Sequence, residues 1–337
     1  MKSYLFIGID ISKATLDVSV FSSSIITDIH YHQFSNSSKG FLQLLKWLKQ
    51  KSAGLSMEDW RVCMENTGMY SLELNCFLHE KGIWQSMENA LQIKRSMGVV
   101  RGKTDKADCQ VIALYAYRFF DKLKQYKLPS VTLLRLKALF SQRERLVSMH
   151  SQLLVGSQSM KGYPKELVKD IQKQNEALLK NLVLQIKLAD KSIRECLQED
   201  DELQRKSKLI QSVPGIGQQT AAYVLIVSRG MENFATAREF ACYSGCAPFE
   251  HTSGTSIRGK TKVHFLANRK MKMLLHMAAI NAITFNDELK TYYQRKVTEG
   301  KKPMSVLNAV RFKLICRIFS VVKRNEEFKK EYQKIAA

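Results

Sequence analysis

The N-terminal third of the chain alternates apolar and polar residues in short runs that predict a β-sheet. Residues 5–9 form an apolar run, residues 15–21 alternate with a period of two, and residues 29–34 interleave polar and apolar positions. Residues 60–64 are a candidate for a buried strand, and residues 84–87 are strand-like, so two further strands are predicted. Apolar residues recur at helical spacing in three segments between and after the strands, at 41–48, 72–78 and 107–120. This order predicts an α/β domain over residues 1–125, in which helices cover a mixed sheet.

The middle of the chain, residues 126–205, follows a different pattern. Residues close to heptad spacing recur between 136 and 150 and again between 178 and 193, with an interruption near Gly162-Tyr163-Pro164. This pattern predicts two long antiparallel helices that form a coiled-coil spacer or oligomerisation arm. The remaining residues, 206–337, predict a mainly α-helical third domain.

The third domain opens with a sequence that is typical of a helix-hairpin-helix element. Residues 209–217 read Leu-Ile-Gln-Ser-Val-Pro-Gly-Ile-Gly, and a helix is expected over 218–228. Gly215 and Gly217 would let the backbone approach a phosphate, and the next helix would offer its free N–H groups. A simple helix-capping turn is the alternative interpretation. Residues 260–330 are basic, and Arg269 and Lys270 are candidate nucleic-acid contacts, although some of these charges form a solvated face.

Charge narrows the classes of partner. The chain has 337 residues with 53 Lys+Arg against 31 Asp+Glu, a net charge of +22. A field of this sign favours a polyanion, and nucleic acid is the leading candidate, with an anionic membrane surface as the alternative. No apolar run approaches the roughly 20 residues that span a bilayer, and the N-terminus does not resemble a signal peptide, so we expect a cytoplasmic protein. The seven cysteines form no C-x-x-C pair and are expected to be structural.

Four carboxylates stand at positions that need an explanation. Asp10 follows the first apolar strand, Glu65 ends the strand at 60–64, and Asp105 and Asp108 lie three residues apart at a helix start. Individually, Asp105 is a possible N-cap and Asp108 a possible partner of the helix dipole. Gathered together, four carboxylates repel unless they are protonated or bridged by cations. In a basic, nucleic-acid-binding protein, the expected cation is Mg²⁺.

The same segments carry a family resemblance. Asp-Ile-Ser-Lys at 10–13, Glu-Asn-Thr-Gly at 65–68 and Lys-Thr-Asp-x-x-Asp-Cys at 103–109 resemble the N-terminal domain of the Piv-type insertion-sequence transposases. The resemblance resumes at residues 212–217 and 240–245 and covers essentially the whole chain. It implies a RuvC-like domain with the RNase H fold, in which the metal ligands are Asp10, Glu65, Asp105 and Asp108.

A polar loop near residue 253 is the second candidate site. From composition alone, His251-Thr-Ser-Gly-Thr-Ser-Ile-Arg-Gly-Lys260 is an ordinary Ser- and Gly-bearing loop. The family resembled here has Ser-Gly-x-Ser-x-Arg-Gly at this place, and the match implies that Ser253 is the nucleophile. Ser256 is the rival, better suited to binding a phosphate, while Arg258 and Lys260 are candidate phosphate contacts. The chain departs from many relatives at residues 263–267, where a Ser-Lys-x-Gly segment is expected.

The resemblance implies a DNA transposase or recombinase. The enzyme would cut and rejoin strands through a covalent phosphoserine, with Mg²⁺ as the activator in preference to His251 as a base. Its partners would be double-stranded donor and target DNA, a structured guide RNA, and further copies of the chain in a dimer or tetramer. Three alternatives stay open: a metal-dependent junction-resolving nuclease without a serine intermediate, a non-catalytic nucleic-acid-binding protein, and an invertase that reads DNA without RNA.

Overall fold

The computed structural model describes residues 2–52, 54–66, 68, 70–98, 104–247, 249–253, 257–263 and 265–329. For residues 161, 165, 249–253 and 257–262 it describes the backbone only. The chain divides into two compact units, Met1–Leu128 and Pro129–Ala337. The helices of the expected arm therefore belong to the same unit as the C-terminal residues. Each unit is described by itself below.

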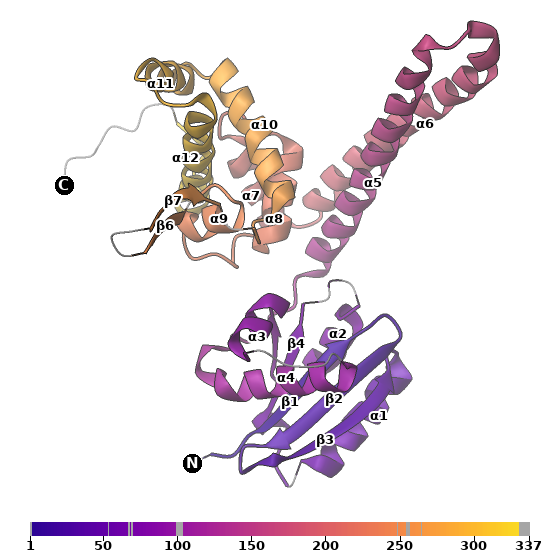
Figure 1. Cartoon of the computed structure of the whole chain (residues 1–337), viewed down its shortest axis with the longest axis vertical. Helices are drawn as coiled ribbons and strands as arrows, with labels where there is room; N and C mark the ends of the chain where they lie inside the picture. The colour runs from indigo at the N-terminus through magenta and orange to yellow at the C-terminus, as the bar shows by residue number, and fades with distance from the viewer. Residues whose placement is uncertain are drawn as a thin grey trace. The chain divides into compact units, whose positions relative to one another are not determined.

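A five-stranded mixed sheet forms the centre of the first unit (Figure 1). Its strands are β1 (Leu5–Ile11), β2 (Thr15–Ser22), β3 (Ile25–Ser35), β4 (Trp60–Glu65) and β5 (Gln85–Glu88), in the order β3-β2-β1-β4-β5. Strands β1, β2 and β3 are antiparallel neighbours, whereas β1, β4 and β5 run parallel. The prediction of an α/β domain with a mixed sheet is confirmed.

Side chains of β1 alternate between the two covered faces of this sheet. Ile7 and Ile9 pack into a core with α1 (Ser38–Lys51) and α2 (Leu72–Glu80). Phe6 belongs to the opposite core, which contains residues of α3 (Ala90–Ser96) and α4 (Asp105–Arg118). Because successive strand residues point to opposite faces, Asp10 lies on the α4 side of the sheet.

The second unit begins with a long helical hairpin. Helices α5 (Val131–Ser159) and α6 (Lys165–Gln198) lie antiparallel, joined by a short 3₁₀ turn at Met160–Gly162 (Figure 1). Arg143 Nε donates to Asp190 Oδ1 at 2.5 Å, and this ion pair ties the middle of one helix to the other. The predicted pair of antiparallel helices is confirmed, and the turn lies beside the predicted Gly-Tyr-Pro break.

The remaining helices share one core with the base of this hairpin. They are α7 (Asp201–Gln211), α8 (Gln218–Ser228), α9 (Ala237–Tyr243), α10 (Arg269–Phe285), α11 (Asp287–Thr298) and α12 (Pro303–Arg324). Leu136 of α5 and Ile193 of α6 are fully buried in the same cluster as Leu225, Leu275 and Leu314. The boundary expected at residue 205 is therefore crossed by a continuous core.

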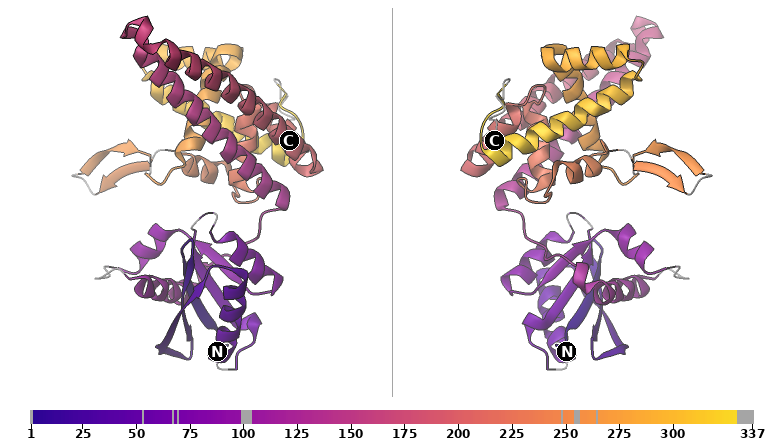
Figure 2. Two further views of the ribbon diagram at one scale, coloured as in Figure 1. Left: turned by 90° about the vertical axis from the view of Figure 1, so that its right-hand side faces the viewer. Right: turned by 90° about the vertical axis from the view of Figure 1, so that its left-hand side faces the viewer.

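Between α9 and α10 the chain forms a two-stranded antiparallel hairpin, β6 (Phe249–Ser253) and β7 (Ile257–Lys262). Figure 2 shows these strands projecting from the helices of the second unit. The interpretation of this segment as a polar loop is wrong: the residues on both sides of 254–256 pair as strands. Among the described residues, no helix combines the length and apolarity that a membrane crossing requires.

Candidate active site

Three of the four predicted acids meet at one end of β1. One carboxylate oxygen from each of Asp10, Asp105 and Asp108 lies within 4.8 Å of the others. Asp10 comes from the penultimate position of β1, and the other two come from the first turn of α4. The N-cap of α4 is Thr104, whose hydroxyl accepts from the N–H of Ala107 at 3.2 Å. The alternative that Asp105 serves as the N-cap is therefore wrong, and its carboxylate is available to the cluster.

A glycine lets α4 come this close to the sheet. A Cβ placed on Gly8 would lie 2.3 Å from both the backbone N of Ala113 and the carbonyl O of Cys109. These distances are far below ordinary van der Waals contact, so the helix backbone packs directly on the strand. Two residues after Gly8 on the same face, Asp10 then meets the first turn of the helix. The acidic cluster thus depends on the close packing of the α4 backbone against Gly8, in which the carboxylates take no part.

Glu65 lies on the neighbouring parallel strand. The register pairs Ile9 with Met64, which places Glu65 at the end of β4 beside the position of Asp10. Its carboxylate is not part of the three-residue group described above. On the next strand, Glu88 pairs with Glu65 in register, and burial raises the pKa of the Glu88 carboxyl. Sequence reasoning missed Glu88, although it follows the strand predicted at 84–87 just as Glu65 follows the strand predicted at 60–64.

The electrostatics of the cluster favour a bound cation. Burial, followed by the negative charge of Asp108, raises the pKa of Asp10 above the usual range of an aspartate. Raising a carboxylate pKa means that the site disfavours its own negative charge when no cation is present. Several carboxylate oxygens at one point form a hard-oxygen donor set, which suits Mg²⁺ or Mn²⁺. The residues present therefore fit a divalent metal site.

Another acid that was not predicted lies next to the cluster. Asp17 of β2 pairs in register with Asp10 and is only 3% exposed. Tyr31 donates its hydroxyl to Asp17 Oδ1 at 2.6 Å, and Gln33 Nε2 donates to the same carboxylate at 3.1 and 3.3 Å. The hydrogen bond from Tyr31 to Asp17 is the main cause that raises the pKa of Tyr31 to about 12. Directly opposed strand residues share a face, so Asp17 adds negative charge beside Asp10.

The predicted nucleophile lies in the second unit, at the end of a strand. Ser253 is the last residue of β6 and pairs with Ile257, while Thr252 pairs with Arg258 across the hairpin. Gly254, Thr255 and the rival Ser256 lie outside the described residues. His251 and Lys260 are strand residues whose side chains are likewise outside the description.

Two asparagines tie down the segment that carries this hairpin. Before it, Asn308 Nδ2 of α12 donates to the carbonyl of Cys246 at 2.8 Å. After it, the backbone N–H of Asn268 donates to the carbonyl of Tyr243 at 2.7 Å, and its side-chain amide donates to the hydroxyl of Tyr243 at 2.7 Å. Both ends of the hairpin segment are therefore fixed to the helical body. Neither asparagine was singled out by sequence, because each makes its contact with a distant residue.

The candidate nucleic-acid residues of this unit have different surroundings. Gly215 has a positive φ of 85°, and a Cβ there would lie 2.4 Å from the carbonyl O of Ala278 in α10, so its close approach is to a helix. Gly217, the N-cap of α8, has open space around it. Lys270 forms an ion pair with Glu144 of α5, whereas Arg269 is exposed.

Comparison with known proteins places these features in a family. Residues 7–159 match the transposase model named for the DEDD domain of IS110, and this match contains all four predicted acids. Residues 207–294 match the model described as the transposase IS116/IS110/IS902 family, and this match contains the β6–β7 hairpin. The chain belongs to this transposase family. The two matches occur in the expected order and together span well over half of the transposase.

Individual relatives agree with this assignment. The transposase is 27% identical to the pilin gene-inverting protein of Moraxella lacunata, over 97% of this chain and 98% of that protein. It is 31% identical to an uncharacterised 43.6 kDa protein of insertion element IS110 from Streptomyces coelicolor, over 35% of this chain and 29% of that one. Among solved structures, T. thermophilus RuvC in complex with a Holliday junction substrate gives a TM-score of 0.28 at 13% identity, covering 36% of this chain and 99% of RuvC.

Proposed function

We propose that this transposase cuts and rejoins DNA strands with the help of a divalent metal held by Asp10, Glu65, Asp105 and Asp108. The observation that carries the proposal is the convergence of three carboxylates, from β1 and from the start of α4, at one point. When bound, Mg²⁺ would neutralise charge on the phosphoryl group and polarise the attacking or leaving oxygen. The carboxylates would hold the ion at the end of β1, and Gly8 would keep α4 close enough for all of them to reach it.

The proposed nucleophile is Ser253. Its hydroxyl oxygen would attack the phosphorus of a phosphodiester, forming an O–P bond as the bond to the 3′-oxygen breaks. The serine proton goes to solvent or a base, and the leaving oxygen is protonated to a 3′-hydroxyl. A 3′-hydroxyl of another strand then reverses the step and releases the serine, so strands are exchanged without net hydrolysis. Arg258, paired across from Thr252, is proposed to bind the phosphate, with Ser256 and Lys260 beside it.

The proposed partners follow from charge and from the relatives. A net charge of +22 supports binding to double-stranded donor and target DNA and to a structured guide RNA. The name of the Moraxella relatives, pilin gene-inverting protein, supports recombination between DNA sites. Strand exchange requires more than one active site, so we propose a dimer or tetramer with the α5–α6 hairpin, acting as a coiled coil, as an interface.

A trapped-intermediate experiment tests the serine. The full chain is incubated with Mg²⁺ and a donor DNA nicked next to the cleavage site, so that the short released strand diffuses away. A protein–DNA adduct stable to denaturing gel electrophoresis is expected from the wild type and from Ser256→Ala, but not from Ser253→Ala. Asp10→Asn is expected to abolish both the adduct and strand cleavage.

The alternative activity gives a different pattern. If Ser253→Ala forms no adduct yet cleaves and recombines at the wild-type rate, the serine step is wrong and a metal-dependent nuclease is the better description. The RNA is tested by purifying the protein from cells that carry its flanking DNA, washing at high salt, and sequencing the RNA that stays bound. One discrete species with segments complementary to donor and target supports guidance, whereas heterogeneous RNA or none contradicts it.

A further inference from the structure

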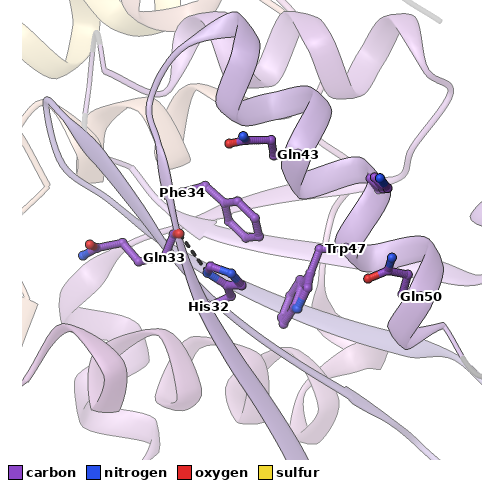
Figure 3. A pocket seen from close by; sticks show the side chains of 7 residues that line it. His32, Gln33, Phe34, Gln43, Trp47 and Gln50 are labelled. Atoms are coloured by element: carbon purple, nitrogen blue, oxygen red, sulfur yellow. Dashed lines mark hydrogen bonds between the residues drawn. The ribbon is translucent and has the colours of Figure 1, made fainter.

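A hollow with a volume of about 350 Å³ lies at the edge of the first unit's sheet (Figure 3). Edge strand β3 forms one side and helix α1 the other, and the residues that line it are His32, Gln33, Phe34, Gln43, Lys46, Trp47 and Gln50. Phe34 belongs to the core on the α1 side of the sheet, together with Ile9. The hollow therefore opens on the face of the sheet opposite to Asp10. The proposed metal site does not account for it.

Three aromatic rings form a continuous wall in this hollow. His32 stacks on the buried ring of Phe34, with 4.6 Å between centroids and 24° between planes. Trp47 meets both rings edge-on, at 5.8 Å from His32 and 5.6 Å from Phe34. His32 itself is exposed, and its Nδ1 donates to the backbone carbonyl of Gln33 at 2.9 Å, which fixes the ring. The outer face of His32 is thus a flat, oriented surface on which another planar ring can stack.

Polar groups that suit a nucleobase and its phosphate surround this wall. The side-chain amides of Gln43 and Gln50 make no hydrogen bond to another residue in the described part of the chain, and Figure 3 shows both beside the aromatic rings. Gln amides pair with base edges. Lys46 is exposed and, within the described residues, forms no ion pair. Helix α1 carries three further lysines, Lys39, Lys49 and Lys51, and no Asp or Glu.

We propose that this hollow binds an unpaired base of a single-stranded nucleic acid segment. The base stacks on His32 against the edge of Trp47, Gln43 and Gln50 contact its polar edge, and the lysines of α1 follow the phosphates. Sequence-tolerant stacking on aromatic side chains beside a basic track is the usual mode of single-strand binding. Lysines on an exposed helix face are often only solvated. A solvated face alone, however, does not explain the stacked aromatic rings and the two glutamine amides beside these lysines.

The location gives the site a role distinct from strand cleavage. Ile9 and Phe34 face the hollow's side of the sheet, whereas Asp10 faces α4, so a base held here does not lie against the carboxylate cluster. The site would hold a single strand, of RNA or of DNA, while the chemistry occurs elsewhere. This inference does not depend on the metal or on Ser253, so its test is independent of the tests of those two sites.

The test uses the full chain. Because other basic surfaces of the chain are also expected to bind nucleic acid, the measurement must report on the hollow itself. Single-stranded 12-mers of RNA or DNA that contain 5-iodouracil are photo-crosslinked to the protein, and the adducts are mapped by peptide mass spectrometry. Adducts on His32 or Trp47 are expected. The strand type that gives the higher yield identifies RNA or DNA as the source of the base.

Two surface variants make the result quantitative. His32→Ala and Lys46→Ala alter exposed side chains, so the fold is expected to persist, and Lys81→Ala at the end of α2 is the charge-matched control. His32→Ala is expected to lower the crosslink yield at Trp47 about tenfold, in line with the loss of one stacked base. Lys46→Ala is expected to lower it severalfold, and Lys81→Ala to leave it unchanged. Crosslinks confined to other peptides, or equal Trp47 yields in all variants, would overturn the proposal.

Discussion

Substituting Gly8 by alanine tests whether the packing of α4 on β1 creates the acidic site. The new methyl group would lie 2.3 Å from two backbone atoms of α4 and 2.8 Å from a third, where ordinary contact is at about 3.5–4.0 Å. Backbone atoms cannot rotate away, so α4 must retreat by about 1 Å, given that contact distance. Overpacking of this kind costs about 1–3 kcal/mol of unfolding free energy. Because Asp105 and Asp108 begin the same helix, the retreat also separates them from Asp10.

Two measurements on the full chain follow from this reasoning. Urea unfolding monitored by circular dichroism is expected to show a lower midpoint for Gly8→Ala, and calorimetric titration with Mn²⁺ a weaker affinity. Gly156→Ala is the matched control, because Gly156 lies inside α5 with nothing within 4 Å, and alanine there is expected to add about 0.5–1 kcal/mol. Wild-type stability together with wild-type Mn²⁺ affinity in Gly8→Ala would refute the close-packing argument.

Three further predictions concern the acids and the second unit. Asp17→Asn is expected to weaken Mn²⁺ binding about 10–100-fold, as for other residues behind metal ligands, while Asp28→Asn, an exposed acid of β3, leaves the calorimetric affinity unchanged. Because the pKa of Asp10 is raised in the folded protein, the metal-free protein should lose stability as pH rises above about 4, where the unfolded chain has already released that proton. Urea midpoints in EDTA between pH 4 and 7 should therefore fall less in Asp10→Asn, and equal slopes would contradict the assignment. Gly215→Ala is expected to lower the melting temperature, because the new methyl group meets the backbone of Ala278 and the residue has a positive φ. Gly217→Ser, in open space at an N-cap, should preserve or raise the melting temperature. Equal losses in the two variants would show that the contact with α10 is unimportant.

Local pattern alone predicted most of the elements of this transposase. The five strands of the first unit, helices α1, α2 and α4 and the α5–α6 pair lie where apolar periodicity placed them, whereas the short helix α3 was not predicted. The period of the apolar residues reports which side of an element faces the core, and it is a property of neighbouring residues. For the same reason, Asp10 and Glu65 stood out as charges that end apolar runs. The four motif acids and the hairpin serine were matched through the order of their motifs along the chain.

Contacts between distant segments decided the rest. Asp17 reads as a solvent-facing residue in an alternating strand, and only the packing of α4 and the bonds from Tyr31 and Gln33 make it a buried neighbour of Asp10. Whether a glycine meets a phosphate or a helix likewise depends on what is packed against it, and at Gly215 that neighbour is α10. The arm shares a core with the C-terminal helices because residues far apart in sequence fill one volume. Periodicity carries no information on such long-range packing, which is set by shape and burial in the folded chain.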